Sequence, residues 1–233
     1  KVCFIGAGNM TRSIVSGLIK HGYPAERVHA TNPSQAKLDA LHADFGVAVS
    51  NDNVKAAEQA DVIVLSVKPQ LMQQVCEQMQ SLDLSNKLVI TIAAGIPAAR
   101  YSEYFNQDIT LIRTMPNTPT QLGFGMTGIY ANDNISEAHK AICQQLMQSG
   151  GKVVWVETED ELNQVIALAG SSPAYFFLFI ESMIETGVSM GMDEAKARAL
   201  AEQAALGAAQ MVIQNQDLSL AQLRNNVTSK GGT

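Results

Sequence analysis

The chain has 233 residues, 46% of them hydrophobic and 16% charged, and this composition excludes an intrinsically disordered protein. The net charge is −6 without a basic run, which argues against nucleic acid and anionic membranes as main partners. The cysteines Cys3, Cys76 and Cys143 are scattered, so we expect no metal site and a reducing compartment such as the cytoplasm. The most apolar stretch, residues 174–180, is too short to span a bilayer.

In the first two thirds of the chain, segments with the apolar pattern of a strand alternate with segments that have the apolar spacing of a helix. Short apolar, β-branched runs predict strands over residues 2–5, 27–31, 47–49, 61–67, 88–92, 109–113, 126–130 and 152–156. The spacing between them predicts helices over residues 10–20, 35–44, 53–60, 70–80 and 136–149. This alternation is typical of βαβ units and of a mostly parallel sheet.

From residue 159 onward, β-branched runs disappear and alanine, leucine, methionine and glutamine dominate. Helices are expected over residues 163–187, 193–215 and 219–226, so we place a domain boundary near residue 157, between domains 1–157 and 158–233. The long helices are apolar over much of their circumference, which predicts burial against another subunit. An ordinary intramolecular helical layer is the alternative. The sequence begins inside a predicted strand and ends inside a predicted loop, so we expect the natural protein to extend further at both ends.

A glycine-rich turn follows the first predicted strand. It reads Gly6-Ala7-Gly8-Asn9-Met10-Thr11 and opens a helix, which is the context of a Rossmann-type dinucleotide fingerprint. The first glycine permits the tight turn, and the second lets the backbone approach a pyrophosphate at the helix N-terminus. Thr11 stands where the pattern has its third glycine. A plain glycine turn is the alternative.

The end of the second strand bears on which dinucleotide binds. Asn32 stands where NAD-preferring sites have a carboxylate, and Ser34 and Lys37 follow it. These side chains can donate to a 2′-phosphate or neutralise it, which favours NADP, with NAD as the alternative. The same residues also form an ordinary proline-containing turn with a helix cap.

Two further strand ends, those of the predicted strands 61–67 and 88–92, are candidates for the wall of the site. Ligands of open α/β sheets lie beyond the carboxyl ends of the strands, so we expect Val67, Lys68, Ala93, Ala94 and Gly95 to wall the nicotinamide half of the site. Lys68 is equally well explained as a solvated lysine at a strand end.

Two further segments have weaker signals. Residues 115–119, with two prolines, form a stiff turn that either walls the site or has no chemical role. Residues 227–233 run from a helix into a loop rich in serine, threonine and glycine, which can bind an anion or form a flexible tail.

In combination and in this order, the motifs resemble those of pyrroline-5-carboxylate reductases. The resemblance covers essentially the whole chain, and the C-terminal loop is its most specific part. It rests on residues 4–10, 61–69, 93–96, 113–119, 171–175, 227–229 and 231–233.

The resemblance implies NAD(P)H-dependent reduction of 1-pyrroline-5-carboxylate to L-proline, the last step of proline biosynthesis, by hydride transfer to the ring C=N carbon. It implies NADPH, with NADH as the alternative, and a Rossmann-type domain followed by an all-helical dimerisation domain. It also implies an interlocked homodimer, often assembled into a decamer. The implied cofactor-binding residues are Gly6, Gly8, Asn9, Met10, Asn32, Ser34, Asn53, Val67, Lys68, Pro69, Ala93, Ala94 and Gly95. The implied substrate-binding residues are Asn117, Val227, Thr228, Ser229, Gly231, Gly232 and Thr233.

The chain departs from the family pattern at three places. Lys230 replaces a proline of the C-terminal loop, and Ser172 and Pro173 are adjacent where the family has an intervening glycine. The threonine expected to bond the substrate nitrogen would follow Thr233, so no catalytic residue can be named.

Two rival functions remain open. A 3-hydroxyacid or 6-phosphogluconate dehydrogenase would need a catalytic lysine on a second-half helix, and Lys196 lies among alanines. A dinucleotide-binding regulator would bind NADP without turnover, and it would need no anion-binding loop.

Overall fold

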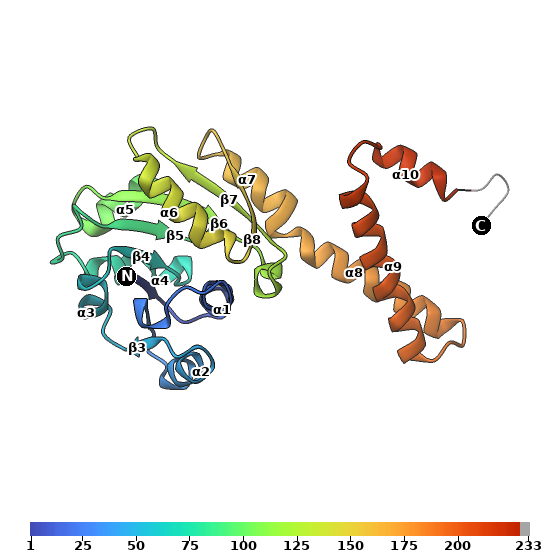
Figure 1. The fold of residues 1–233 in the computed structure, drawn as a ribbon, viewed down its shortest axis with the longest axis horizontal. Helices are drawn as coiled ribbons and strands as arrows, with labels where there is room; N and C mark the ends of the chain where they lie inside the picture. Colours follow the sequence, from blue (N-terminus) through green and yellow to red (C-terminus); the bar gives the residue numbers. More distant parts are fainter. Residues whose placement is uncertain (229–233) are drawn as a thin grey trace. The chain divides into compact units, whose positions relative to one another are not determined.

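The computed structural model describes residues 1–228, and its contacts divide the chain into a first unit, Lys1–Pro173, and a second unit that begins at Ala174 (Figure 1). The first unit contains one eight-stranded sheet in the order β3-β2-β1-β4-β5-β6-β7-β8. Only β6 and β7 pair antiparallel, and every other neighbouring pair is parallel. The strands are β1 (Val2–Ile5), β2 (Val28–Thr31), β3 (Ala48–Ser50), β4 (Val62–Leu65), β5 (Leu88–Thr91), β6 (Thr110–Met115), β7 (Gly125–Ala131) and β8 (Gly151–Trp155).

Helices cover both faces of this sheet, because successive strand residues point to opposite faces and both sets are apolar. On one face Phe4 packs in a core with α1, α2 and α6, and on the other Ile5 packs in a core with α3, α4 and α5. The helices of the first unit are α1 (Asn9–Lys20), α2 (Gln35–Phe45), α3 (Asn53–Glu58), α4 (Pro69–Gln78), α5 (Ala98–Phe105), α6 (Glu137–Gln148) and α7 (Glu161–Val165), with 3-10 turns η1 (Ala25–Arg27) and η2 (Thr118–Leu122).

The predicted α/β fold is confirmed, including its mostly parallel sheet, with two local differences. Helix α5 was not predicted, because only Tyr101 and Phe105, four residues apart, carry its apolar face. Strand β4 ends at Leu65 rather than at residue 67, since the chain turns there towards the N-terminus of α4.

The predicted boundary near residue 157 precedes the observed division after Pro173, because α7 packs on the sheet. A Cβ atom on Gly128 of β7 would lie 2.8 Å from both methyl groups of Val165, so the glycine makes room for the helix. The predicted helix 163–187 is also not regular. A π-helical turn, η3 (Ile166–Gly170), separates α7 from α8 (Ser172–Ser189).

The second unit consists of helices that bury little within the described chain. It contains most of α8, then α9 (Glu194–Gln214) and α10 (Leu220–Asn226). No side chain of α8 is buried within residues 1–228, and only Ala197 and Ala201 of α9 are. The two helices approach closely at Gly187, whose added Cβ would lie 3.0 Å from that of Ala197.

The apolar surface of α8 corrects one expectation about membranes. The helical run Glu161–Ser189 has 29 residues, its most apolar window has a mean hydropathy of 1.4, and none of that window is buried. By length and composition alone this run could cross a bilayer, although residues 174–180 are too short to do so. Helices that are covered by protein can have the same length and composition, so these two properties alone do not indicate a membrane span.

The three cysteines lie in the two cores of the first unit. Cys3, Cys76 and Cys143 are all free and fully buried. Burial raises the pKa of each thiol to about 12, so all three remain protonated and unreactive at neutral pH.

Candidate active site

The glycine-rich turn lies at the carboxyl end of β1. Gly6 has φ +109° and donates its N–H to Thr31 O at 2.9 Å. A Cβ atom at Gly6 would stand 2.7 Å from Ser66 O, so only glycine fits between β1 and the end of β4. A Cβ atom at Gly8, in contrast, would meet nothing within 4 Å. The first glycine therefore serves the fold, and the second leaves space for a ligand.

Helix α1 begins directly after this turn with its N-terminus free of side-chain caps. Its N-cap is Gly8, which has no side chain to cap the helix, and no acidic residue occupies the first turn. The uncapped N–H groups and the positive end of the helix dipole suit an anion such as a pyrophosphate. Thr11, which replaces the third glycine, is buried and donates its hydroxyl to Gly6 O at 2.7 Å, so it stabilises the turn. These features fit a dinucleotide.

Three of the predicted residues lie at or beside the end of β2. Asn32 Oδ1 accepts the Ala7 N–H at 3.2 Å, which ties the second strand to the glycine turn. Asn53 Oδ1 accepts the Thr31 hydroxyl at 2.6 Å. Ser34 is the N-cap of α2 but makes no capping hydrogen bond, so its hydroxyl is available to a ligand. Asn32, Ser34 and Asn53 therefore all lie at or beside the carboxyl end of β2.

The ends of β4 and β5 supply the next wall. Strand β4 pairs with β1 in the parallel sheet, and β5 pairs with β4 on its other side, so Val67, Lys68 and Pro69 follow at the same end of the strands as Gly6. Lys68 is exposed at the N-cap of α4, and Pro69 occupies its first turn. After β5, a loop of small residues continues this wall. Ala93 is buried, Ala94 is half-buried, and Gly95 is exposed with φ +76°.

Ser66 begins the segment of residues 66–69 that follows β4 and lies beside the turn, but no site role is predicted for it. Its Oγ is buried and has no hydrogen-bond partner among the described residues. Its carbonyl is the atom that excludes a side chain at Gly6. A serine directly after an apolar strand was the available signal.

Asn117 follows β6 and is engaged within the protein. Its Nδ2 donates to Ala169 O in the π-helical turn at 3.0 Å, and its Oδ1 accepts the Met126 N–H at 2.9 Å. A π turn leaves carbonyl groups outside the regular helical pattern, and Asn117 satisfies one of them. One amide N–H remains for a ligand, so the substrate contact predicted for Asn117 uses a side chain that already holds two elements in place.

Only part of the C-terminal segment is described. Val227 is the C-cap of α10 and is exposed, and the Thr228 hydroxyl donates to Arg224 O at 2.8 Å. The predicted substrate-binding residues Ser229, Gly231, Gly232 and Thr233 lie outside the described residues.

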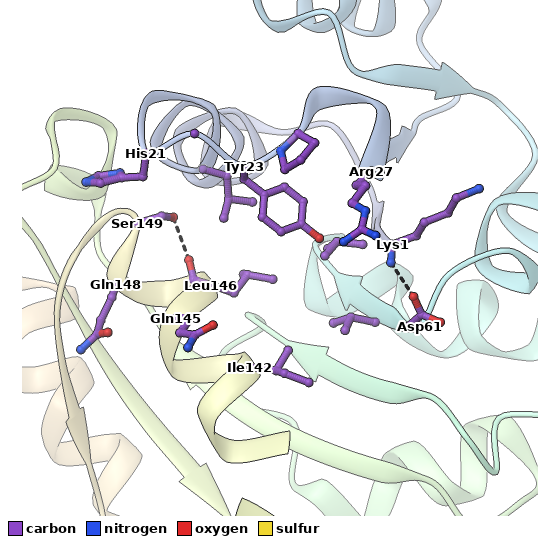
Figure 2. Close-up of a pocket in the computed structure, with 15 residues that line it drawn as sticks. Lys1, His21, Tyr23, Arg27, Asp61, Ile142, Gln145, Leu146, Gln148 and Ser149 are labelled. Atoms are coloured by element: carbon purple, nitrogen blue, oxygen red, sulfur yellow. Dashed lines mark hydrogen bonds and ion pairs between the residues drawn. The ribbon is translucent and has the colours of Figure 1, made fainter. Parts of the chain in front are cut away.

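A cavity of about 700 Å³ lies elsewhere, at the amino ends of β1 and β4 (Figure 2). Val2 and Val62, the first residues of these strands, line it together with Tyr23, Arg27 and Asp61. This cavity contains none of the predicted site residues, because the glycine turn lies at the opposite, carboxyl end of β1. Among residues 1–228, no cluster of three metal-ligating side chains occurs.

Two sequence families match the chain. The one described as "Pyrroline-5-carboxylate reductase dimerisation" matches residues 159–233, and the one described as "NADP oxidoreductase coenzyme F420-dependent" matches residues 1–95. A pyrroline-5-carboxylate reductase of Vibrio alginolyticus is 54% identical over 233 residues, which are 100% of this chain and 86% of the relative. The Escherichia coli pyrroline-5-carboxylate reductase is 36% identical over 234 residues, with the same coverage.

Solved structures give the same result. A pyrroline-5-carboxylate reductase of Coxiella burnetii matches with a TM-score of 0.90 and 40% identity, over 100% of this chain and 86% of that one. The Plasmodium falciparum pyrroline carboxylate reductase, solved with NADP bound, matches with a TM-score of 0.89 and 28% identity, with the same coverage.

Proposed function

Since the chain belongs to the pyrroline-5-carboxylate reductase family, we propose that it reduces 1-pyrroline-5-carboxylate to L-proline with NADPH. The observation that carries this proposal is the 54% identity to a named reductase over the full length of the chain. The glycine turn supports it independently, because an open space at Gly8 faces an uncapped helix N-terminus.

The chain's residues have binding and positioning roles in this reaction. The reduced nicotinamide supplies a hydride, which adds to the carbon of the C=N bond, while the nitrogen keeps the bond's electron pair and its proton. A protonated imine is already electrophilic, so the chain needs no strong general acid at this carbon. The N-terminus of α1 holds the pyrophosphate, and the loop after β5 excludes water from one side of the nicotinamide.

The predicted site divides between the two predicted domains. We assign residues 1–157 to cofactor binding and residues 158–233 to dimerisation and substrate binding, in keeping with the families that match residues 1–95 and 159–233. In this assignment Val227 and Thr228 contact the substrate, and Ser229, Gly231, Gly232 and Thr233 bind its carboxylate. Asn117 adds one substrate contact from the first domain.

We further infer that α8 and α9 are covered by a second subunit rather than by lipid, because the matching family is a dimerisation family. Assembly of such dimers into a decamer is the larger form that we propose. The three free, buried cysteines fit a reducing compartment, and we place the protein in the cytoplasm.

A spectrophotometric assay tests the proposed function directly. We expect NADPH absorbance to fall only when 1-pyrroline-5-carboxylate is added, with L-proline as the product, and to fall more slowly with NADH. A chain that binds NADP but oxidises neither cofactor would instead be a dinucleotide-binding regulator.

Asn32→Asp tests the cofactor preference. Aspartate keeps the oxygen that accepts the Ala7 N–H but adds a negative charge beside the 2′-phosphate of NADPH. We expect kcat/KM with NADPH to fall roughly 10–100-fold, and kcat/KM with NADH to change less than about threefold. Asn32→Ser, which adds no charge, is the control. An equal loss with both cofactors would show that Asn32 does not read the 2′ position.

A further inference from the structure

A buried polar network lies under the loop that joins β5 to α5, the loop expected to wall the nicotinamide. At the start of this loop, Thr91 Oγ1 accepts the Ala93 N–H at 3.3 Å and is 2.7 Å from the Tyr101 hydroxyl. The Thr114 hydroxyl donates to Thr91 O at 3.0 Å. Thr91 and Tyr101 are fully buried, so water does not compete for these hydrogen bonds.

The other end of the loop is held by an ion pair. Glu159 Oε1 accepts the backbone N–H of Ala98, the first residue of α5, at 2.6 Å. The same oxygen accepts from Arg113 Nη1, also at 2.6 Å. Arg113 lies on β6 directly beside Thr91 of β5, so both ends of the loop are tied to neighbouring residues of the sheet.

Stability alone does not account for this ion pair. The Arg113 side chain is 10% exposed, and its Nε has no hydrogen-bond partner among residues 1–228. The Glu159 side chain is 31% exposed, so Arg113 is the desolvated partner, and its lost hydration and unsatisfied donor offset much of the attraction between the two charges. The pair does, however, fix the first N–H of α5 in direction and distance.

We propose that Thr91, Tyr101, Arg113 and Glu159 form a positioning network that holds the loop of Ala93, Ala94 and Gly95 at the distance hydride transfer requires. This inference rests on the proposed function and adds residues to it. None of the four touches the reacting atoms; they act through the backbone of the loop. Gly95, with φ +76°, would otherwise let the loop adopt several conformations. Transfer rates depend steeply on placement, so a shift of about 1 Å is expected to slow the reaction.

Tyr101→Phe tests the first half of the network. Burial raises the pKa of Tyr101 to about 12, so the variant removes a neutral hydroxyl and no charge. We expect the single-turnover rate of NADPH oxidation to fall at least fivefold, while the Kd of NADPH stays within twofold. Tyr104→Phe is the matched control, because it removes a hydroxyl from the same helix and keeps the ring that packs edge to face on Tyr101 and beneath Arg100. Its rate should equal that of the unmodified chain.

Glu159→Gln tests the second half with a readout that needs no substrate. Glutamine retains an acceptor for the Ala98 N–H but leaves Arg113 without its counter-charge. We expect amide hydrogen exchange of residues 93–98 to accelerate at least tenfold without cofactor. Glu157→Gln, which changes an exposed carboxylate two residues earlier, should leave that exchange unchanged.

The two readouts separate the network from the reaction itself. Faster exchange of the loop in Glu159→Gln, with slower turnover in Tyr101→Phe at constant NADPH Kd, is the expected result. Unchanged exchange in Glu159→Gln, an unchanged rate in Tyr101→Phe, or equal losses in Tyr101→Phe and Tyr104→Phe would each overturn the proposal. An unmodified chain that oxidises no NADPH refutes the proposed function, while the exchange measurement still decides whether the network holds the loop.

Discussion

Gly6→Ala is expected to abolish NADPH binding and to destabilise the first unit by about 2–4 kcal/mol. The new Cβ would lie 2.7 Å from Ser66 O and 3.0 Å from Ser66 C, which are backbone atoms that cannot rotate away. The residue also has φ +109°, which alanine rarely adopts. The end of β4 would have to move, and the loop at the N-terminus of α1 would move with it. Urea unfolding and fluorescence titration with NADPH measure the two effects.

Gly8→Ala is the matched control in the same turn. Its Cβ would meet nothing within 4 Å, and its φ of −82° is common for alanine. The free energy of unfolding should therefore change by less than about 0.5 kcal/mol. The methyl group would still occupy the space where we place the pyrophosphate, so we expect the Kd of NADPH to rise at least tenfold. Equal stability losses in both variants, or unchanged NADPH affinity in both, would contradict this division of roles.

Met183→Asp is expected to convert the dimer into monomers. Met183 is 39% exposed within the described chain and lines an apolar groove of α8 and α9 together with Phe179 and Leu200. If a second subunit covers this groove, the variant places an unpaired carboxylate in an apolar interface, which costs several kcal/mol. The dimer dissociation constant should then rise more than a hundredfold, as measured by light scattering over a dilution series.

Ile142→Asp is the control for surface charge. Ile142 is on helix α6 of the first unit and is 40% exposed, so the two substitutions change similar amounts of accessible apolar surface. We expect this variant to remain dimeric. Dissociation by Ile142→Asp, or a dimeric Met183→Asp, would mean that the groove of α8 and α9 is not the interface.

Most of the fold could be predicted because its strands are buried on both faces. Continuous apolar runs such as that of β4 and the glycine turn after β1 are local signals, and both survive in the structure. Helix α5 was missed because it has only two buried residues, Tyr101 and Phe105, and two apolar positions do not establish a helical period. A π-helical turn was also beyond prediction, since its carbonyl of Ala169 is satisfied by Asn117, far away in the sequence.

Site residues could be predicted where the residue type and its position directly after a strand are the signal. Gly6, Gly8 and Asn32 are of this kind, and their geometry fits a dinucleotide. The network of Arg113 and Glu159 could not be predicted, because it depends on a contact between residues that the sequence separates by two strands and a helix. The identities of the residues gave no sign that they would meet.

The place of β1 in the sheet has a consequence for how the chain folds during synthesis. This strand lies between β2 and β4, and Ile5 pairs with both Thr31 and Leu65. Until Leu65 has left the ribosome, β1 can pair only with β2, so its other edge stays open. Phe4 and Ile5 therefore stay accessible to chaperones during that interval. The apolar helix α8 is made only after the whole sheet, so dimer assembly becomes the last and concentration-dependent step of folding.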